Sequence, residues 1–263
     1  MAVPEFLVIS AVVRNEGGVV NILVVDVGGT NVKLWKSSEG ECEKLTSGKK
    51  LTPAKLVDRV RRHTANESFD RVSLGYPGEV RHGHPSADPY NLAAGWVDFD
   101  WSNAFDCPLR IMNDACLQAL GSYEGGRMLY LGLGTGLGSS FIFDGQVIPL
   151  ALGPLRSKRG EAYSEYLGRD GLKRHGKQIW RDVALEAGVS LKASFLADYV
   201  VFGGGNAKRL GELPEGCRKG GNHNAYFGGV RLWQDVHPQD GPRLAAVPPV
   251  ISGRTTAAAP ARI

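Results

Sequence analysis

The stretch VVDVGGTNVK at residues 24–33 predicts two strands joined by a glycine-rich turn. The apolar run up to its aspartate predicts one strand and the following VKLWKS predicts a second, so the two glycines lie in the turn between them. Gly28 and Gly29 let backbone N–H groups approach phosphate oxygens without a Cβ in the way, and Thr30 adds a hydroxyl donor. Asp26, at the end of the first strand, is placed to bind Mg²⁺ directly or through water. A plain β-hairpin turn also favours Gly-Gly, so this stretch alone leaves both interpretations open.

A second glycine-rich stretch, LGLGTGLGSS at residues 131–140, follows another apolar run. Its residues Gly134, Thr135, Gly136 and Gly138 predict a second phosphate-binding turn, with the threonine as a donor. A strand rather than a helix follows, which excludes a dinucleotide-binding fingerprint, and the absence of a GK[ST] sequence excludes a Walker loop. Tight hairpins also use glycine, so a structural role stays open here too.

Between these turns, MNDA at residues 112–115 places an acid at the start of a predicted helix. Asn113 is a favoured N-cap, and the helix dipole stabilises a carboxylate in the first turn, so Asp114 has a purely structural interpretation as a capping acid. The functional interpretation is a general base that accepts the proton of an attacking hydroxyl in phosphoryl transfer, where positioning and electrostatics provide most of the rate.

Three consecutive glycines, Gly203, Gly204 and Gly205, separate the predicted strand DYVVF from NAKRL. A turn of this kind lets a purine ring or a ribose lie against the backbone. The structural alternative is a strand-to-helix connection that needs positive φ.

The chain as a whole alternates strands and helices, which predicts an α/β protein whose second half repeats the order of the first. The long helical stretch 171–197 is expected to break near Gly188. Other predicted elements are strands at 22–27, 71–76 and 109–114, a helix at 53–64 and a hairpin within 128–148. We divide the chain into an N-terminal extension (1–20), a small lobe (21–116), a large lobe (117–236) and a disordered tail (237–263), with the cleft between the lobes.

The composition is that of a soluble globular protein, with 43% hydrophobic and 22% charged residues. The net charge of +4 is too weak and too scattered to predict a nucleic-acid surface. Basic residues concentrate in two groups: Arg156, Lys158 and Arg159, and Lys173, Arg174 and Lys177. Each group is either a solvated surface or a local positive field that attracts a polyanionic substrate.

The cysteines and the apolar N-terminal run predict the cellular setting. Cys42, Cys107, Cys116 and Cys217 are far apart and form no CxxC pair, so we expect no zinc and reduced thiols in the cytoplasm. The apolar residues 6–13 are too few for a membrane span and lack the basic start of a signal peptide. We expect no membrane or nucleic-acid partner.

The ordered motifs DVGGT, GYPG, NLAAGW, MNDA, GLGTGLG and GGGNAK resemble those of the ROK family of sugar kinases, and especially its polyphosphate-glucokinase-like branch. The resemblance extends over residues 22–234. It implies the two-lobed fold of actin, hexokinase and the heat-shock chaperone ATPases, with ribonuclease H-like lobes around a central cleft. It also implies a homodimer, Mg²⁺, and ATP or polyphosphate as the phosphoryl donor.

The resemblance assigns a role to each motif. Asp114 matches the catalytic base that deprotonates the sugar hydroxyl, and Asp26 matches the first phosphate motif and the Mg²⁺ contact. The remaining residues match phosphate or nucleotide contacts (Gly28, Gly29, Thr30, Gly134, Thr135, Gly136, Gly138, Gly203, Gly204, Gly205) and the sugar pocket (Pro77, Gly78, Asn91, Asn113).

One segment departs from the family pattern. Where related kinases carry E-x-G-H, whose Glu and His hold sugar hydroxyls, this chain has Ala151-Leu152-Gly153-Pro154. A buried site that loses a hydrogen-bonding partner loses about 1–3 kcal/mol for each one.

We therefore expect a hexokinase- or glucokinase-type phosphotransferase that acts on the 6-hydroxyl of a hexose such as glucose. The alternative is a non-catalytic sugar- or nucleotide-binding relative with a degraded sugar pocket. An actin-like filament ATPase is less well supported, because GYPG and NLAAGW would then have no use.

Overall fold

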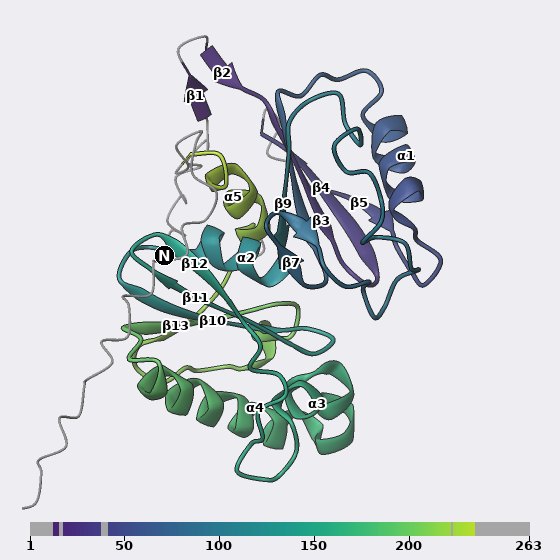
Figure 1. Cartoon of the computed structure of the whole chain (residues 1–263). Helices are drawn as coiled ribbons and strands as arrows, with labels where there is room; N and C mark the ends of the chain where they lie inside the picture. The colour runs from purple at the N-terminus through teal and green to yellow at the C-terminus, as the bar shows by residue number, and fades with distance from the viewer. Residues whose placement is uncertain (1–12, 16–17, 38–41, 222, 235–263) are drawn as a thin grey trace, which may run out of the picture.

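The computed structural model describes residues 13–15, 18–37, 42–221 and 223–234, and it has two lobes that each contain a five-stranded sheet (Figure 1). The predicted disordered tail and most of the predicted N-terminal extension lie outside the described residues. Within that extension, β1 (Val13–Asn15) and β2 (Gly18–Val20) form a short antiparallel pair. The predicted mixed α/β architecture with two lobes is confirmed.

The sheet of the small lobe has the strand order β5-β4-β3-β6-β9. Its three parallel strands are β3 (Ile22–Val27), β6 (Arg71–Tyr76) and β9 (Leu109–Asn113), and the antiparallel strands β4 (Asn31–Lys36) and β5 (Cys42–Thr46) complete one side. All residues of β3 are buried. A fully buried strand is expected to be largely apolar, and Asp26 is the one charged residue in this strand.

The helix α1 (Pro53–His63) covers one face of this sheet. Thr52 caps it by accepting a hydrogen bond from the Lys55 backbone N–H at 3.3 Å, and proline occupies the first turn, where no N–H is needed. The helix buries Leu56, Val57 and Val60 among the side chains of the sheet. The other face of the sheet packs against α2 (Asp114–Ser122) and α5 (Asn224–Arg231). A small hairpin, β7 (Val80–Arg81) and β8 (His84–Pro85), follows β6.

The sheet of the large lobe has the order β12-β11-β10-β13-β14. Its strands are β10 (Arg127–Leu133), β11 (Leu137–Phe143), β12 (Gln146–Leu150), β13 (Tyr199–Gly203) and β14 (Cys217–Lys219). The predicted hairpin corresponds to β10 and β11, which are antiparallel partners. The helices α3 (Tyr163–Leu167) and α4 (Arg169–Ser194) lie together below this sheet in Figure 1.

The predicted break near Gly188 is wrong, because the irregular residue of α4 is Gly176, with φ 77° and ψ 163°. Gly188 is buried inside the helix, and a Cβ on it would collide with the ring of Phe202 on β13. This glycine therefore provides close helix–sheet packing rather than a bend. The helix predicted after the glycine turn at residues 203–205 is only a 3₁₀ turn, η1 (Ala207–Arg209).

Two helices join the lobes (Figure 1). α2 (Asp114–Ser122) follows the last small-lobe strand, and α5 (Asn224–Arg231) follows the large-lobe sheet but packs against the small lobe. They cross so closely that a Cβ on Gly121 or on Gly228 would overlap the backbone of the other helix. The boundary placed near residue 116 falls inside α2 and stays a proposal. None of the described helices is long and apolar enough to cross a membrane.

Candidate active site

Asp26 lies at the end of β3 with only 5% of its surface exposed. Gly75 on the neighbouring strand makes room for it, since a Cβ there would lie 3.2 Å from Asp26 Oδ1. The Lys33 Nζ lies 3.4 Å from Asp26 Oδ2, and the two residues are direct partners in the β3–β4 ladder. Burial raises the pKa of Asp26, and the ammonium of Lys33 opposes that rise.

Our sequence interpretation missed Lys33. The strand register decides its position. Val27 pairs with Val32 and Asp26 with Lys33, so the turn is centred between Gly29 and Thr30, whereas a turn centred on the two glycines would place Asn31 opposite Asp26.

Several hydrogen bonds hold the first glycine turn in place. The Gly28 N–H donates to the Asn31 carbonyl at 3.0 Å, and the Ser47 hydroxyl donates to the Gly28 carbonyl at 2.7 Å. The Ser47 N–H donates to the Thr30 carbonyl at 3.0 Å. A Cβ on Gly28 would lie 2.9 Å from the Asn31 oxygen, so this position needs glycine. Ser47, just after β5, thus holds the first glycine turn in place, although it lies outside the DVGGT motif.

Asp114 is the first residue of α2 and is half-buried. Its Oδ1 accepts a hydrogen bond from the Ala115 N–H at 2.8 Å. The pKa of Asp114 is raised to about 7, first by burial and then by the negative charge of Asp26. The two carboxylates therefore lie close enough to interact electrostatically. Asp114 could be a simple capping acid by its sequence, but a capping acid at the surface would have neither this burial nor a second carboxylate beside it.

Asn113 joins the catalytic candidate to the predicted sugar pocket. Its Oδ1 accepts hydrogen bonds from the N–H groups of Ala115 and Cys116, which caps α2. Its Nδ2 donates to the Gly78 carbonyl at 2.9 Å. An amide nitrogen carries two hydrogens, so one N–H of Asn113 remains for a ligand. The predicted sugar residues Pro77, Gly78 and Asn113 thus lie together beside Asp114.

Asn91 lies against the first glycine turn. A Cβ added to Gly29 would lie 3.3 Å from the Asn91 Cβ, so the predicted sugar contact and the predicted phosphate contact are neighbours. This arrangement is what a kinase cleft requires, because the accepting hydroxyl and the transferred phosphoryl must meet.

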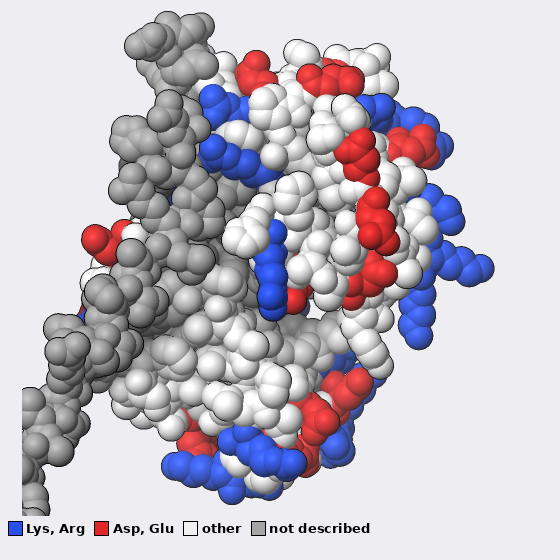
Figure 2. All heavy atoms as spheres, in the orientation of Figure 1, with Lys and Arg blue, Asp and Glu red and all other residues white. Residues whose placement is uncertain are grey.

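The second glycine turn reaches the same place from the large lobe. A Cβ on Gly138 would lie 2.8 Å from the Ala115 side chain, directly after Asp114. The turn closes through the Gly134 N–H, which donates to the Gly136 carbonyl at 3.1 Å, and the Thr135 carbonyl accepts from the Arg169 N–H at 3.2 Å. Figure 2 shows a hollow where the two lobes meet, with basic and acidic side chains at its edge.

The predicted nucleotide turn adjoins the second glycine turn. Asn206 Nδ2 donates to the Gly134 carbonyl at 3.3 Å. Gly204 has φ +76° and its Cβ position would overlap the backbone of Leu133, so glycine is required there for both reasons. Gly203 is packed on the ring of Tyr130, and Gly205 is unobstructed.

The segment from Ala151 to Pro154 provides no side chain that can hydrogen-bond a sugar. Leu152 and Gly153 are buried, and Ala151 and Pro154 are exposed. The Gly153 carbonyl accepts from the Ser164 N–H at 2.9 Å, which places this segment against the start of α3.

Most polar residues that could replace the missing contacts are engaged elsewhere. Arg156 donates to the Gly160 carbonyl, and Lys158 lies 2.9 Å from Glu186. Glu161 forms an ion pair with Arg174, and its Oε1 lies 3.2 Å from His175 Nε2. Glu165, exposed in α3, is the member of this set with no side-chain hydrogen bond or ion pair to a described residue.

Asp26 and Asp114 are the residues of the candidate site that could contact a metal ion. In the described part of the chain, no three His, Cys, Asp or Glu side chains are grouped to hold a metal ion. Mg²⁺ needs fewer protein ligands than that, since it keeps several waters and takes one or two carboxylates together with substrate phosphates. Two neighbouring carboxylates, one of which raises the pKa of the other, fit such an ion.

Comparisons with known proteins are informative only at the level of structure. No protein-family model and no curated protein matches this chain. Among solved structures, the inorganic polyphosphate/ATP-glucomannokinase from Arthrobacter sp. strain KM has a TM-score of 0.69 and 22% identity, covering 81% of this chain and 98% of that one. The ROK family glucokinase from Streptomyces griseus, in complex with glucose and AMPPNP, has a TM-score of 0.61 and 17% identity, with 81% and 98% covered.

A ROK family protein from Streptococcus pneumoniae, in complex with sucrose, has a TM-score of 0.61 and 13% identity, with 81% and 97% covered. The structural neighbours are thus ROK family sugar kinases, as the sequence motifs predicted. At these identities the likeness establishes the fold, which is that of the hexokinase-like ROK kinases.

Proposed function

We propose that this chain is a sugar kinase that transfers a phosphoryl group from ATP or polyphosphate to the 6-hydroxyl of a hexose such as glucose. The observation that carries the proposal is the position of Asp114, a half-buried carboxyl with a pKa of about 7 next to Asp26. Glycine turns from both lobes adjoin this pair of carboxyls. The names of the structural neighbours support the same class of reaction.

Asp114 is the proposed general base. A base works best when its pKa is near the working pH, because it is then largely ionised and still basic enough to accept a proton. Asp114 accepts the proton of the sugar 6-hydroxyl while the sugar oxygen bonds to the phosphorus of the donor. The bond between that phosphorus and the donor's bridging oxygen breaks, and the shortened donor leaves with the electron pair.

The phosphates are held by the two glycine turns. Gly29 and Thr30 offer backbone and hydroxyl donors from the small lobe, and Thr135 and Gly136 offer them from the large lobe. The N–H groups of Gly28 and Gly134 close the two turns. The Lys33 ammonium adds a positive charge beside Asp26. When bound, Mg²⁺ neutralises negative charge on the transferred group, and Asp26 is its proposed protein contact.

The sugar is proposed to lie between Asn91, the Pro77-Gly78 turn and the free N–H of Asn113. A nucleotide donor would lie against Gly203–Gly205 in the large lobe. We further propose, from the family resemblance and the reduced cysteines, a cytoplasmic enzyme that works as a homodimer.

A second candidate function is a non-catalytic sugar- or nucleotide-binding protein. The exposed Ala151 and Pro154 favour it, because they provide no hydrogen bond to a sugar hydroxyl.

A phosphorylation screen separates the two functions. Several hexoses are incubated with ATP or polyphosphate, and sugar phosphate formation is measured by a coupled assay. Turnover of any hexose that is lost in the Asp114→Asn variant supports the kinase. Binding of a hexose or nucleotide without turnover supports the second function.

A further inference from the structure

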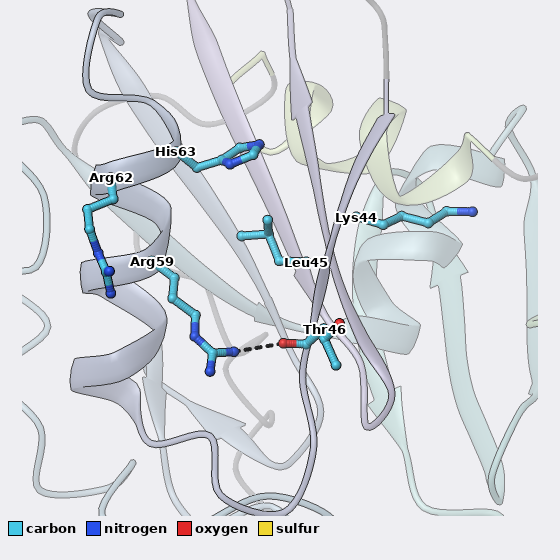
Figure 3. A pocket seen from close by; sticks show the side chains of 6 residues that line it. All are labelled: Lys44, Leu45, Thr46, Arg59, Arg62 and His63. Atoms are coloured by element: carbon cyan, nitrogen blue, oxygen red, sulfur yellow. Dashed lines mark hydrogen bonds between the residues drawn. The ribbon is translucent and has the colours of Figure 1, made fainter.

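Asp26, Lys33 and Lys44 form one row across three adjacent strands. Asp26 on β3 is the direct partner of Lys33 on β4, and Lys33 is the direct partner of Lys44 on β5. Directly paired residues of neighbouring strands project from the same face of a sheet. Figure 3 shows Lys44 directed to the opposite side of β5 from Arg59 and His63, which lie on the α1 side.

This row lies on the face of the sheet that carries the candidate active site. On the same face, the pair Val24 and Trp35 is buried in the cluster that contains residues of α5. In the opposite direction along the strands, the pair Asn31 and Thr46 leads to Ser47, whose hydroxyl donates to the Gly28 carbonyl. The two lysines therefore lie between α5 and the first glycine turn.

The positive charge of the row exceeds what its protein partners neutralise. Lysines that are directly opposite on neighbouring strands repel one another and destabilise a sheet. Lys33 has Asp26 at 3.4 Å, but Lys44 is exposed and makes no hydrogen bond or ion pair with a described residue. An open groove of about 680 Å³ that Lys44 borders lies on the other side of β5, where Arg59, Arg62 and His63 of α1 line it.

We propose that Lys33 and Lys44 hold a linear phosphoanhydride chain that runs from the transferred phosphoryl group across β4 and β5 to the sheet edge. The inference rests on the proposed kinase function, because that function places a phosphoryl group beside Asp26. Adjacent strands lie about 4.8 Å apart, so the two ammonium groups can contact different phosphates of one chain. The repulsion between the lysines is then relieved by the ligand.

Binding along this path would distinguish a long phosphate chain from ATP as the phosphoryl donor. The adenosine of ATP would lie against Gly203–Gly205 in the large lobe, so its phosphates approach Asp26 from the side away from Lys44. A phosphate chain has no base to place and keeps its negative charge along its length. Lys44 is therefore a specificity residue for long phosphate chains, whereas Lys33 contacts any donor.

The test measures binding without sugar, so that no turnover occurs. Wild type, Lys44→Gln and Arg62→Gln are titrated by calorimetry with long-chain polyphosphate, tripolyphosphate and MgATP. Arg62 is a matched control, because it is an exposed cation that lines the same groove on the α1 side of β5. We expect Lys44→Gln to weaken long-chain binding by about fivefold, as for one exposed ion pair, with little change for MgATP or in Arg62→Gln.

Three results would overturn the inference. They are no binding of long chains by wild type, equal weakening in the Arg62 variant, and equal weakening for MgATP. The hexose screen reports separately on the proposed function. If long chains bind through Lys44 but no hexose is phosphorylated with any donor, the kinase proposal fails while the chain-binding row stands.

Discussion

Asp114, at the start of α2, lies close enough to Asp26, at the end of β3, for the charge of Asp26 to raise its pKa. The two residues are 88 positions apart in the sequence numbering, and they meet because β3, β6 and β9 are successive parallel neighbours in one sheet. Parallel strands end at the same edge, so the residues that follow them gather there. The proximity of the two carboxyls is a direct result of this strand order.

The first prediction concerns the pH dependence of turnover. A general base must be deprotonated, so the kcat/KM of the wild type, which reports the free enzyme, is expected to rise with pH around a midpoint near 7, the pKa of Asp114. Asp114→Asn is expected to lower kcat by about 10²–10⁴-fold with an unchanged circular dichroism spectrum. A flat pH profile between pH 5 and 9 (bounds chosen about the roughly neutral pKa), or full activity in the variant, would contradict the assignment.

The second prediction concerns Lys33, which lowers the pKa of both carboxyls by its positive charge. Lys33→Gln removes that charge, so the midpoint of the pH–rate profile should move above that of wild type. Its kcat should also fall, because the transferred phosphoryl loses a cation. Lys55→Gln on α1 removes an exposed lysine away from the site and should change neither quantity. A midpoint that moves down would show that Lys33 does not act on Asp114.

The third prediction concerns stability. Because the pKa of Asp114 is raised in the folded state, that state holds the proton more tightly than the unfolded chain does. Its contribution to the free energy of unfolding is therefore present at low pH and is lost as pH rises through the folded pKa of about 7. Asp114→Asn should be more stable than wild type at pH values above 7 by about 1–3 kcal/mol, measured by urea unfolding. Equal stabilities there, in the absence of Mg²⁺, would be inconsistent with an unfavourable carboxylate.

Sequence reasoning predicted the parts of the candidate site that depend on local chain conformation. The glycine turns at Gly28-Gly29 and Gly134–Gly138 were predicted because a buried apolar strand and a turn without Cβ atoms leave a clear pattern over a few residues. Asp114 was predicted because the start of a helix has its own residue preferences. Each of these features depends only on residues within one hairpin or one turn of a helix.

Features that depend on contacts between distant segments were missed or misread. The glycine at position 188 was interpreted as a helix break, although its reason is the Phe202 ring on a strand that follows later. Lys33 reaches the candidate site because strand pairing places it opposite Asp26, and α5 reaches the small lobe from the far end of the chain. No local pattern contains that information.

The fourth prediction concerns the crossing of α2 and α5. A Cβ on Gly228 would overlap the Leu117 carbonyl, so Gly228→Ala should separate the helices and cost about 1–3 kcal/mol of folding free energy. Ser190→Ala, at an exposed position of α4, should have almost no effect. Thermal unfolding of both variants measures the difference. If the two melt together, the close approach of the helices is not needed for stability.

The fifth prediction concerns the segment where sugar contacts are missing. Ala151→Glu combined with Pro154→His introduces the polar side chains of the E-x-G-H pattern at two exposed positions of the loop beside Gly153. Two restored hydrogen-bonding groups, at about 1–1.4 kcal/mol each, would lower the KM for glucose by roughly 30- to 100-fold. Pro154→Ala alone controls for the loss of the proline and should leave KM unchanged. If the double variant binds glucose more tightly but forms no glucose phosphate, the defect lies at the phosphate side rather than in this loop. That result would favour the non-catalytic alternative, because Asp114 would have the raised pKa of a general base but would not support phosphoryl transfer.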